Sequence, residues 1–568
     1  MFISRVCSTG KNGRSYVSIL LRESKRTGKK VASRTLAILT DLPQWLIAIV
    51  ENAVEKGKDA SSIEQLVAAS HSKLGFRNAE SFGAAFLVHE VAKACHIPAA
   101  LGSSHEAKLA LWQVCARVLS PATSLLAMIR LASGCAASSL LGFQQSFNED
   151  DLYANGSWVV GKQAKIEKKL WLSRPAQPSK SLFLYDVTSS YFEGEHNALA
   201  EFGYNRDKVK GKRQVVMGLL TDADGEPVSV SLFPGNTSDL QTFGSQVEKL
   251  KTHFGQEHIT MVGDRGMIRG PQQAQAKEAG FHFISGLHKA EIETLLKNGT
   301  LQMSLFDNKV AESTLADGRR VVTRCNPVRR QEMATAREGF RTRMELWVAQ
   351  ACTYLDEHPK AGVATQMKTG LLRLRRGNLH AWMRLEVNGR TLSLVADEKL
   401  LQEHSKLDGC YAVVSDLPAE VADSQELHDR YKDLAKVESG FRTLKHGHLE
   451  IRPWYVTNEA NTRAHALTAM LALKIRLRLQ SAWEPLNMTV EEGLKELTAL
   501  SVMEVYEPKS GKIVCRQIPE PNRTQADLLA ALGVVLPTRI GPAGPDVATR
   551  VKLNKRRKSA VRMRAKIT

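Results

Sequence analysis

Residues 181–190 read SLFLYDVTSS, a run that is almost entirely apolar up to Asp186. Strands that are buried on both faces have this continuous apolar character, so the run predicts a central strand with Asp186 at or near its end. Two further runs, RQVVMGLL and PVSVSLF, flank TDADGE, where Asp224-Gly225 favours a tight hairpin. The segment therefore predicts three successive strands.

A helix and two more strands are predicted beyond these three strands. Asp239 could cap a helix that begins LQTFGSQVEKL, and HITMVGDRG then predicts a fourth strand that ends at Asp264. HFISGL predicts a short fifth strand. Strands that alternate with helices indicate an α/β fold built on a mixed five-stranded sheet.

The rest of the sequence divides around this unit. Residues 1–40 carry short β-like runs, and residues 41–178 have mainly helical periodicity and are expected to form a DNA-binding N-terminal domain. The core is expected to occupy 179–286 and 411–482, where a long helix covers about 425–446 and another about 460–480. Residues 287–410 look like a β-rich insertion, and 483–568 form a C-terminal region whose end, from Arg550, is a basic tail.

The composition favours a polyanionic partner. Lys and Arg number 78 against 59 Asp and Glu, so the formal net charge of the 568 residues is +19. Nucleic acid fits such an excess, although a solvated basic surface would give the same count. With 43% apolar residues, a chain of this length exceeds what one core organises, and two or more domains are expected.

The spacing of the cysteines and the hydropathy of the chain indicate the cellular compartment. The eight cysteines include no Cys-x2-Cys pair, so neither a zinc site nor a disulfide framework is predicted. No apolar run approaches the roughly 20 residues of a membrane span, and the first residues lack the apolar core of a signal peptide. We therefore expect a soluble cytoplasmic protein that has no membrane partner and no organic cofactor.

Three carboxylates are the candidate catalytic residues. Two-metal cleavage of a phosphodiester needs carboxylates that converge on cations about 4 Å apart, and rigid strand ends suit Asp186 and Asp264 to that task. An Asp at a strand end is more often a turn former or cap. On the predicted helix, Glu438 lies beside an apolar stripe that would pack on the sheet, although a surface helix with a Glu438–Arg442 pair explains the same pattern.

A family resemblance rests on the segment YKDLAKVESGFRTLK (431–445). It resembles the Tyr-x2-Arg-x3-Glu-x6-Lys motif of bacterial insertion-sequence transposases that have a DDE catalytic triad and a β-strand insertion before the Glu. Tyr431, Glu438 and Lys445 match, whereas Leu434 replaces the Arg, as in one branch of the group. YDVTSSYFEG, the stretch 203–239, VGDRGM and LEIRPWYV resemble the successive blocks of that family in the same order.

The resemblance implies a ribonuclease-H-like core in which Asp186, Asp264 and Glu438 hold two divalent ions, Mg²⁺ or Mn²⁺. It implies a DNA transposase that binds inverted-repeat ends, cleaves them and joins the freed 3′ hydroxyls to target DNA. Double-stranded DNA is the implied partner, and a homodimer would assemble on it. The implied location is the cytoplasm of a bacterium, in association with the nucleoid.

Basic residues near the triad are the candidate DNA contacts. In the resembled motif Tyr431 and Lys445 would contact phosphate, and Arg442 and Arg265 are further candidates. The other candidates are basic residues of the resembled blocks: Arg206, Lys212, Arg213 and Arg452. Trp454 could stack on a base, although an isolated Trp is more often a core residue.

Two alternatives stay open at this point. The chain could be a DNA-binding regulator derived from an inactive transposase, although its intact triad argues against that function. It could also be a ribonuclease-H-like metal-dependent nuclease that has no strand-transfer step.

Overall fold

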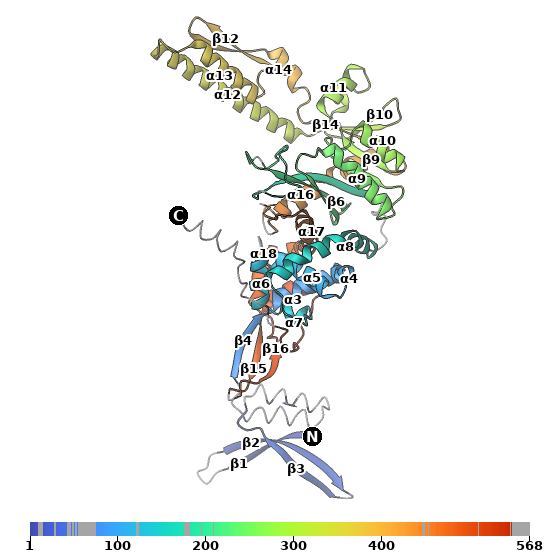
Figure 1. Ribbon diagram of the computed structural model, residues 1–568, viewed down its shortest axis with the longest axis vertical. Coiled ribbons are helices and arrows are strands. Elements are labelled where there is room, and N and C mark those ends of the chain that lie inside the picture. Colours follow the sequence, from blue (N-terminus) through green and yellow to red (C-terminus); the bar gives the residue numbers. More distant parts are fainter. Residues whose placement is uncertain are drawn as a thin grey trace. The chain divides into compact units, whose positions relative to one another are not determined.

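The computed structural model describes residues 1–568 with gaps. The gaps are residues 10–14, 28–29, 43–46, 48–49, 52–53, 55–74, 121–123, 175–181, 195, 208, 446–448, 452–453, 509, 546 and 548–568. The chain forms two compact units (Figure 1). One unit comprises 1–98, 102–153 and 475–568, and the other, which we call the catalytic unit, comprises 99–101 and 154–474.

The catalytic unit is built on an eight-stranded mixed sheet in the order β10-β11-β14-β9-β8-β5-β6-β7. β5 pairs with β8 and β8 with β9 in parallel, and the other pairs are antiparallel. The bounds are β5 Leu182–Tyr191, β6 Gln214–Asp222, β7 Pro227–Pro234, β8 Thr260–Gly263, β9 His282–Gly286, β10 Ala311–Thr314, β11 Arg320–Cys325 and β14 Cys410–Ser415.

The five expected strands are present as β5 to β9, and Gly225 has a positive φ of 81° in the expected hairpin. The expected total of five was too small, because β14, β11 and β10 extend the sheet beyond β9. Asp264 directly follows β8 as expected, whereas Asp186 lies in the middle of β5. β5 continues past Asp186 because Val187 to Ser190 are all buried and pair with β6.

Helices cover both faces of this sheet. On one face, Phe183 and Tyr185 of β5 share a buried core with α9 (Asp239–Thr252), α10 (Gly270–Glu278) and α11 (Lys289–Lys297). Successive side chains of a strand alternate between faces, so Asp186 belongs to the other face. Here α16 (Leu434–Lys445) packs on β5 and β6, and its Gly440 lies close to Leu219, the β6 residue opposite Asp186.

The single helix expected at about 425–446 is in fact two helices. α15 (Ser424–Lys432) ends at Asp433, and α16 begins at the next residue. The expected apolar stripe is confirmed, since Leu434, Val437, Phe441 and Leu444 are all buried. The following helix, α17, spans Glu459–Trp483.

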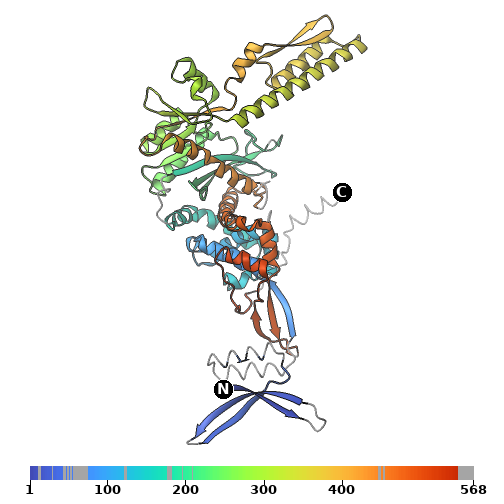
Figure 2. The ribbon, with the colours of Figure 1, turned by 180° about the vertical axis from the view of Figure 1, so that it is seen from behind.

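The prediction of a β-rich insertion is wrong. Between β11 and β14 the chain forms α12 (Pro327–Glu357), α13 (Val363–Arg376), the hairpin β12 (Met383–Asn388) and β13 (Thr391–Ala396), and α14 (Glu398–Ser405). These elements group together in both views and share a core of their own (Figures 1 and 2). The basic runs that suggested strands include the exposed faces of long helices, and Asn326 with Pro327 gives α12 a typical start.

The other unit begins with an antiparallel sheet of β1 (Phe2–Thr9), β2 (Ser15–Thr27) and β3 (Lys30–Ile38), where strands were expected. β4 (Gly75–Ser81) falls in a segment expected to be helical, and it pairs with β15 (Ser501–Tyr506) from the far end of the chain. Local hydrophobic periodicity cannot predict a strand whose partner is so distant in the sequence. The remaining elements of this unit are α3 Gly83–Ala94, α5 His105–Leu119, α6 Leu125–Gly134, α7 Ala137–Leu140, α18 Val490–Thr498, β16 Ile513–Gln517 and α19 Arg523–Ala530. The helices α4 Ile97–Leu101 and α8 Glu149–Leu172 each have residues in both units.

Among the described residues, no helix combines the length and the apolar character that a bilayer crossing requires.

Candidate active site

One cavity of the catalytic unit brings the three candidate carboxylates together. It has a volume of about 730 Å³, and its walls include Asp186 from β5, Asp264 from the end of β8 and Glu438 from α16. These residues are separated by 78 and 174 positions in the sequence, so only the sheet pairing and the docking of α16 unite them. The cavity is therefore the candidate active site.

Asp186 is held rigidly within β5. Its Oδ1 accepts a hydrogen bond of 2.8 Å from the backbone N–H of Val187. Burial raises the pKa of Asp186 to about 7; the Val187 N–H and Arg206 oppose that rise, while the carboxylates of Asp264 and Glu438 add to it. The charges of Asp264 and Glu438 thus act on the Asp186 carboxylate, which is expected if the three carboxylates bind the same cations.

Asp264 is exposed at the start of a turn, close to Tyr431. The backbone N–H of Arg265 donates to Asp264 Oδ1 over 2.7 Å, and the Asp264 carboxylate acts electrostatically on the Tyr431 phenol. The buried position of Tyr431 and the nearby Asp264 raise the pKa of its phenol. A Cβ on Gly286 of β9 would lie 2.5 Å from the Tyr431 hydroxyl oxygen, so only glycine leaves room for this ring.

Glu438 is exposed on α16, one residue after Val437 of the buried stripe. Among the described residues its carboxylate has no hydrogen-bond or ion-pair partner. A helix that buries four apolar side chains against β5 and β6 fixes the direction in which Glu438 extends. The side chain is thus placed by packing and left available for a ligand.

The three carboxylates fit hard divalent cations. Oxygen ligands are what Mg²⁺ and Mn²⁺ prefer, and a deprotonated Asp186 would add to an uncompensated negative charge in the cavity. Within the described part of the chain, no three acidic, His or Cys side chains lie close enough together to hold one metal ion between them. Mg²⁺ does not require three such side chains, because it usually takes one or two carboxylates and completes its shell with water and substrate phosphate.

Two charged residues of the cavity were not singled out from the sequence for this role. Asp239 was interpreted only as a helix cap, yet the cap of α9 is Ser238, and Asp239 carries its carboxylate into the cavity wall. Arg269 also lines the cavity, and its Nη2 lies 2.8 Å from His288 Nε2. Arg206 lines it too, as a candidate DNA contact should, and its Nη2 donates to both Asp239 oxygens over 2.5 and 2.6 Å.

Lys445, a candidate phosphate contact of the motif, is buried at the end of α16. Its side chain is only 8% exposed, and its Nζ lies 3.0 Å from Asp207 Oδ1, which is 4% exposed. The break at Asp433 places Tyr431 on α15, whereas Glu438 and Lys445 both lie on α16. A contact of Lys445 with DNA stays a prediction.

Four further candidate DNA contacts lie outside the cavity wall. Arg442 is exposed on α16, and Arg265 is exposed beside Asp264. Lys212 pairs with Glu193 over 2.7 Å, and the guanidinium of Arg213 lies 5.6 Å from the centre of the Phe202 ring. Arg452 lies outside the described residues.

Trp454 is not available to stack on a base. Its side chain is 1% exposed, and its ring packs edge-on against that of His465, 5.1 Å between centroids. The alternative reading of this Trp as a core residue is confirmed.

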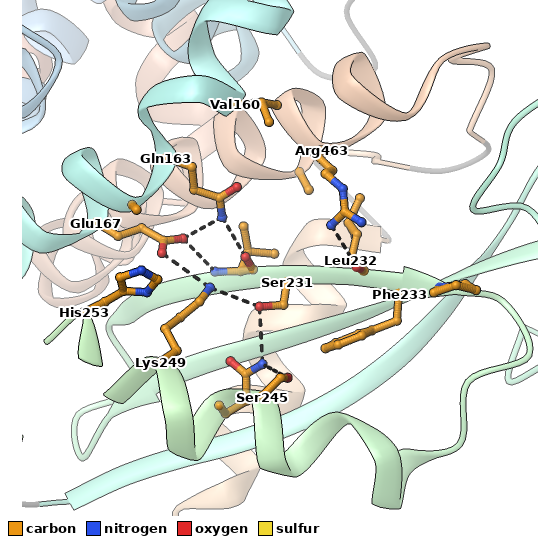
Figure 3. A pocket seen from close by; sticks show the side chains of 15 residues that line it. Val160, Gln163, Glu167, Ser231, Leu232, Phe233, Ser245, Lys249, His253 and Arg463 are labelled. Carbon is orange, nitrogen blue, oxygen red and sulfur yellow. Dashed lines mark hydrogen bonds and ion pairs between the residues drawn. The ribbon is translucent and has the colours of Figure 1, made fainter. Parts of the chain in front are cut away.

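A second cavity, of about 510 Å³, lies along the outer strand β7 (Figure 3). Glu167 of α8 is 2% exposed there and accepts hydrogen bonds from Gln163 Nε2, Ser229 Oγ and Val230 N over 2.8, 3.0 and 3.3 Å. Lys249 Nζ lies 3.5 Å from Glu167 Oε2 and donates to Ser229 Oγ over 2.7 Å. We call Glu167, Lys249, Gln163 and Ser229 the edge network.

The edge network also satisfies the outer backbone groups of β7. Gln163 Nε2 donates to Val230 O over 2.8 Å, and Arg463 of α17 donates to Leu232 O over 2.9 Å (Figure 3). Side chains that cap an edge strand prevent it from pairing with another chain. The second cavity thus serves the fold.

Comparisons with known proteins place the candidate active site within a recognised domain. The family model described as "Transposase DDE domain" matches residues 177–475, more than half of the chain, and this range contains Asp186, Asp264 and Glu438. Among solved structures, the chain is similar to a chain of a piggyBac transposase synaptic complex with hairpin DNA, at 8% identity and a TM-score of 0.36 over 69% of each chain. No curated protein sequence matches it.

Proposed function

Since the chain belongs to the transposase DDE domain family and is a DDE transposase, we propose that it mobilises an insertion sequence by cutting and joining DNA at the ends of that element. In this proposal it binds the terminal inverted repeats, cleaves the ends and joins the 3′ hydroxyls to target DNA. The observation that carries the proposal is the single cavity whose walls include Asp186, Asp264 and Glu438.

In the proposed site, Asp186, Asp264 and Glu438 hold two divalent cations, Mg²⁺ or Mn²⁺. When bound, these cations would activate the attacking oxygen and neutralise the charge that develops on the leaving oxygen. The donor set supports this assignment, because all three ligands are carboxylates and α16 and β5 hold two of them on rigid elements.

The chain's own residues orient the reactants. The Val187 and Arg265 N–H groups fix the Asp186 and Asp264 carboxylates, which reduces the reorganisation needed when DNA binds. Arg206 and Arg269 present guanidinium groups at the cavity wall, where they can bind the scissile phosphate. Both cleavage and joining are in-line displacements at phosphorus, so one site serves both, first with water and then with a 3′ hydroxyl as nucleophile.

Double-stranded DNA is the proposed partner. The net charge of +19 supports binding to a polyanion, and Lys212, Arg213, Arg265, Arg442 and Arg452 extend the proposed DNA surface beyond the cavity. We expect two copies of the chain to assemble on the DNA, because two ends must be held together. The proposed place of action is the nucleoid of a bacterial cell.

Cleavage assays on triad variants test this proposal. The substrate is a plasmid that carries the genomic DNA flanking this gene on both sides, incubated with Mg²⁺. Asp186→Ala, Asp264→Ala and Glu438→Ala should each lose cleavage while they retain DNA binding, because each loses a metal ligand and keeps the basic surface. Asp317→Ala, which removes an exposed ion pair with Arg319 outside the cavity, should cut like the unsubstituted protein.

The same assay separates the competing functions. Cleavage at the unsubstituted rate by any triad variant would contradict the assignment of the site. An unsubstituted protein that binds the flanking DNA and never cuts it would support a regulator. When a target plasmid is added, cut donor without joined product would support a nuclease that has no strand-transfer step.

A further inference from the structure

The candidate active site contains a half-buried ion pair that the chemistry described so far does not use. Asp239 is a fourth carboxylate of the cavity wall, and Arg206 Nη2 donates to both of its oxygens. The two side chains are 33% and 26% exposed, so the pair is largely shielded from water. A shielded, charge-assisted pair fixes side-chain direction better than an exposed one does.

Asp239 is free to hold Arg206 because other residues cap its helix. At the start of α9, the Ser238 and Gln241 side chains form a reciprocal capping box. Asp239 is the first residue of the helix itself, and no capping bond uses its carboxylate. The carboxylate therefore has Arg206 as its partner.

The backbone of Arg206 is anchored to the elements that carry the triad. The Arg206 N–H donates to Ser189 Oγ over 3.0 Å, three residues after Asp186 on β5. The next residue, Asp207, accepts from the Tyr191 N–H over 3.2 Å and from Lys445 Nζ over 3.0 Å. These three hydrogen bonds tie the segment around Arg206 to β5 and to the last turn of α16.

The pair also leaves part of the guanidinium available. Both bonds to Asp239 use Nη2, and among the described residues Nη1 and Nε have no acceptor. A guanidinium carries five N–H donors in a planar fork, so one edge can bind a carboxylate while another binds a phosphate oxygen. The neighbouring carboxylates of the cavity indicate where that phosphate would lie.

We propose that Asp239 is a positioning residue that holds the Arg206 guanidinium for contact with the scissile phosphate. This inference rests on the proposed function, because it assumes that DNA is cut in this cavity. Asp239 acts through Arg206 and touches neither substrate nor metal. Removal of Asp239 should therefore matter only while Arg206 is present.

A double-mutant cycle tests this dependence. On the flanking-DNA plasmid with Mg²⁺, Asp239→Ala and Arg206→Ala should each slow cleavage by about tenfold to a hundredfold, the range for loss of a hydrogen bond to a charged group. The double variant should be no slower than Arg206→Ala alone. Arg206→Lys should restore part of the rate, because it keeps a cation at this position.

Control measurements keep the outcomes distinct. Asp186→Asn must abolish cleavage by the same preparation; if it does not, the proposed function fails and not only this inference. Thermal midpoints identify variants that fail to fold. The half-saturating Mg²⁺ concentration of Asp239→Ala should equal that of the unsubstituted protein, because no metal ligand is lost.

Three results would overturn the inference. A further rate loss for Asp239→Ala in the Arg206→Ala background would mean that Asp239 acts independently of Arg206. A severalfold rise in the Mg²⁺ requirement would make Asp239 a metal ligand. Cleavage by Asp239→Ala at the unsubstituted rate would mean that the ion pair has no part in the reaction.

Discussion

The active-site cavity and the edge-network cavity contain the same kinds of side chains in different states of pairing. In the edge network, Glu167 accepts three hydrogen bonds and lies beside Lys249. In the active-site cavity, Glu438 has no partner among the described residues, and burial raises the pKa of Asp186 to about 7. The Glu167 carboxylate is neutralised within the chain, whereas the Glu438 carboxylate is left available for a ligand.

This difference separates a structural role from a functional one. A buried charge that is fully paired adds little net stability, but removal of one partner leaves the other unpaired and is costly. A carboxylate without a cation is a cost to the folded protein that a ligand can relieve. Changes at the edge network should therefore alter stability, and changes at the active-site cavity should alter activity and the response to metal.

The largest expected effect on stability is at the edge network. Glu167→Ala should destabilise the catalytic unit by about 3–5 kcal/mol, because it leaves Lys249 shielded and without its counterion. The thermal midpoint of the metal-free protein measures this loss. The joint replacement Glu167→Leu with Lys249→Met should restore most of it, since two apolar side chains leave no orphaned charge. A midpoint of Glu167→Ala equal to that of Asp317→Ala would show that the network contributes nothing.

Divalent cations should stabilise the protein through the active-site cavity. Mn²⁺ at a hundredfold excess over its Kd should add about 2.7 kcal/mol, an effect that a chelator reverses. Because the gain depends on the carboxylates, Asp264→Asn should lose most of it, whereas Glu167→Ala should keep it. Differential scanning fluorimetry with and without Mn²⁺ provides the comparison. If Mn²⁺ stabilised Asp264→Asn as much as the unsubstituted protein, the metal would have to bind at another site.

An effect of comparable size should appear in the pH dependence of the metal-free protein. The pKa of Asp186 is about 7, against an ordinary value of 3.8. The folded state keeps a proton that the unfolded chain has lost between these values, so its stability falls as pH rises through 7. Asp186→Asn is neutral throughout, so its melting temperature should exceed that of the unsubstituted protein at pH 8. The advantage should shrink toward pH 5, and a constant difference would contradict the origin of the shift.

The smallest effect is expected at the exposed pair of Lys212 and Glu193. Lys212→Ala should change stability by less than about 1 kcal/mol, because exposed ion pairs contribute little. If Lys212 contacts a phosphate, the slope of log affinity for DNA against log salt should fall by about one. Fluorescence anisotropy at several salt concentrations measures that slope. An unchanged slope would remove Lys212 from the DNA surface.

The sequence was informative where a local pattern and a family motif agreed. The apolar runs predicted β5 to β9, and the spaced motif placed Glu438 beside a stripe that is indeed buried. The insertion was misread because basic runs on long helices resemble strand patterns, and only packing within its own core distinguishes them.

The pairing of charges could not be predicted in this way. Arg206 and Asp239 are 33 residues apart, and Lys445 and Asp207 are 238 apart, so each pair forms only when strands and helices dock. The motif suggested that Lys445 faces DNA, whereas the fold buries it against Asp207. Which charges find partners is a property of the tertiary structure, and that property distinguishes the two cavities.

Counting bound metal ions tests the central claim most directly. Mn²⁺ can be titrated into the protein bound to its flanking DNA, and free Mn²⁺ can be followed by electron paramagnetic resonance. We expect two more bound ions per chain for the unsubstituted protein than for the variant that combines Asp186→Asn, Asp264→Asn and Glu438→Gln. Equal numbers of bound ions in the two proteins would contradict the assignment of the cavity as the metal-dependent site of cleavage.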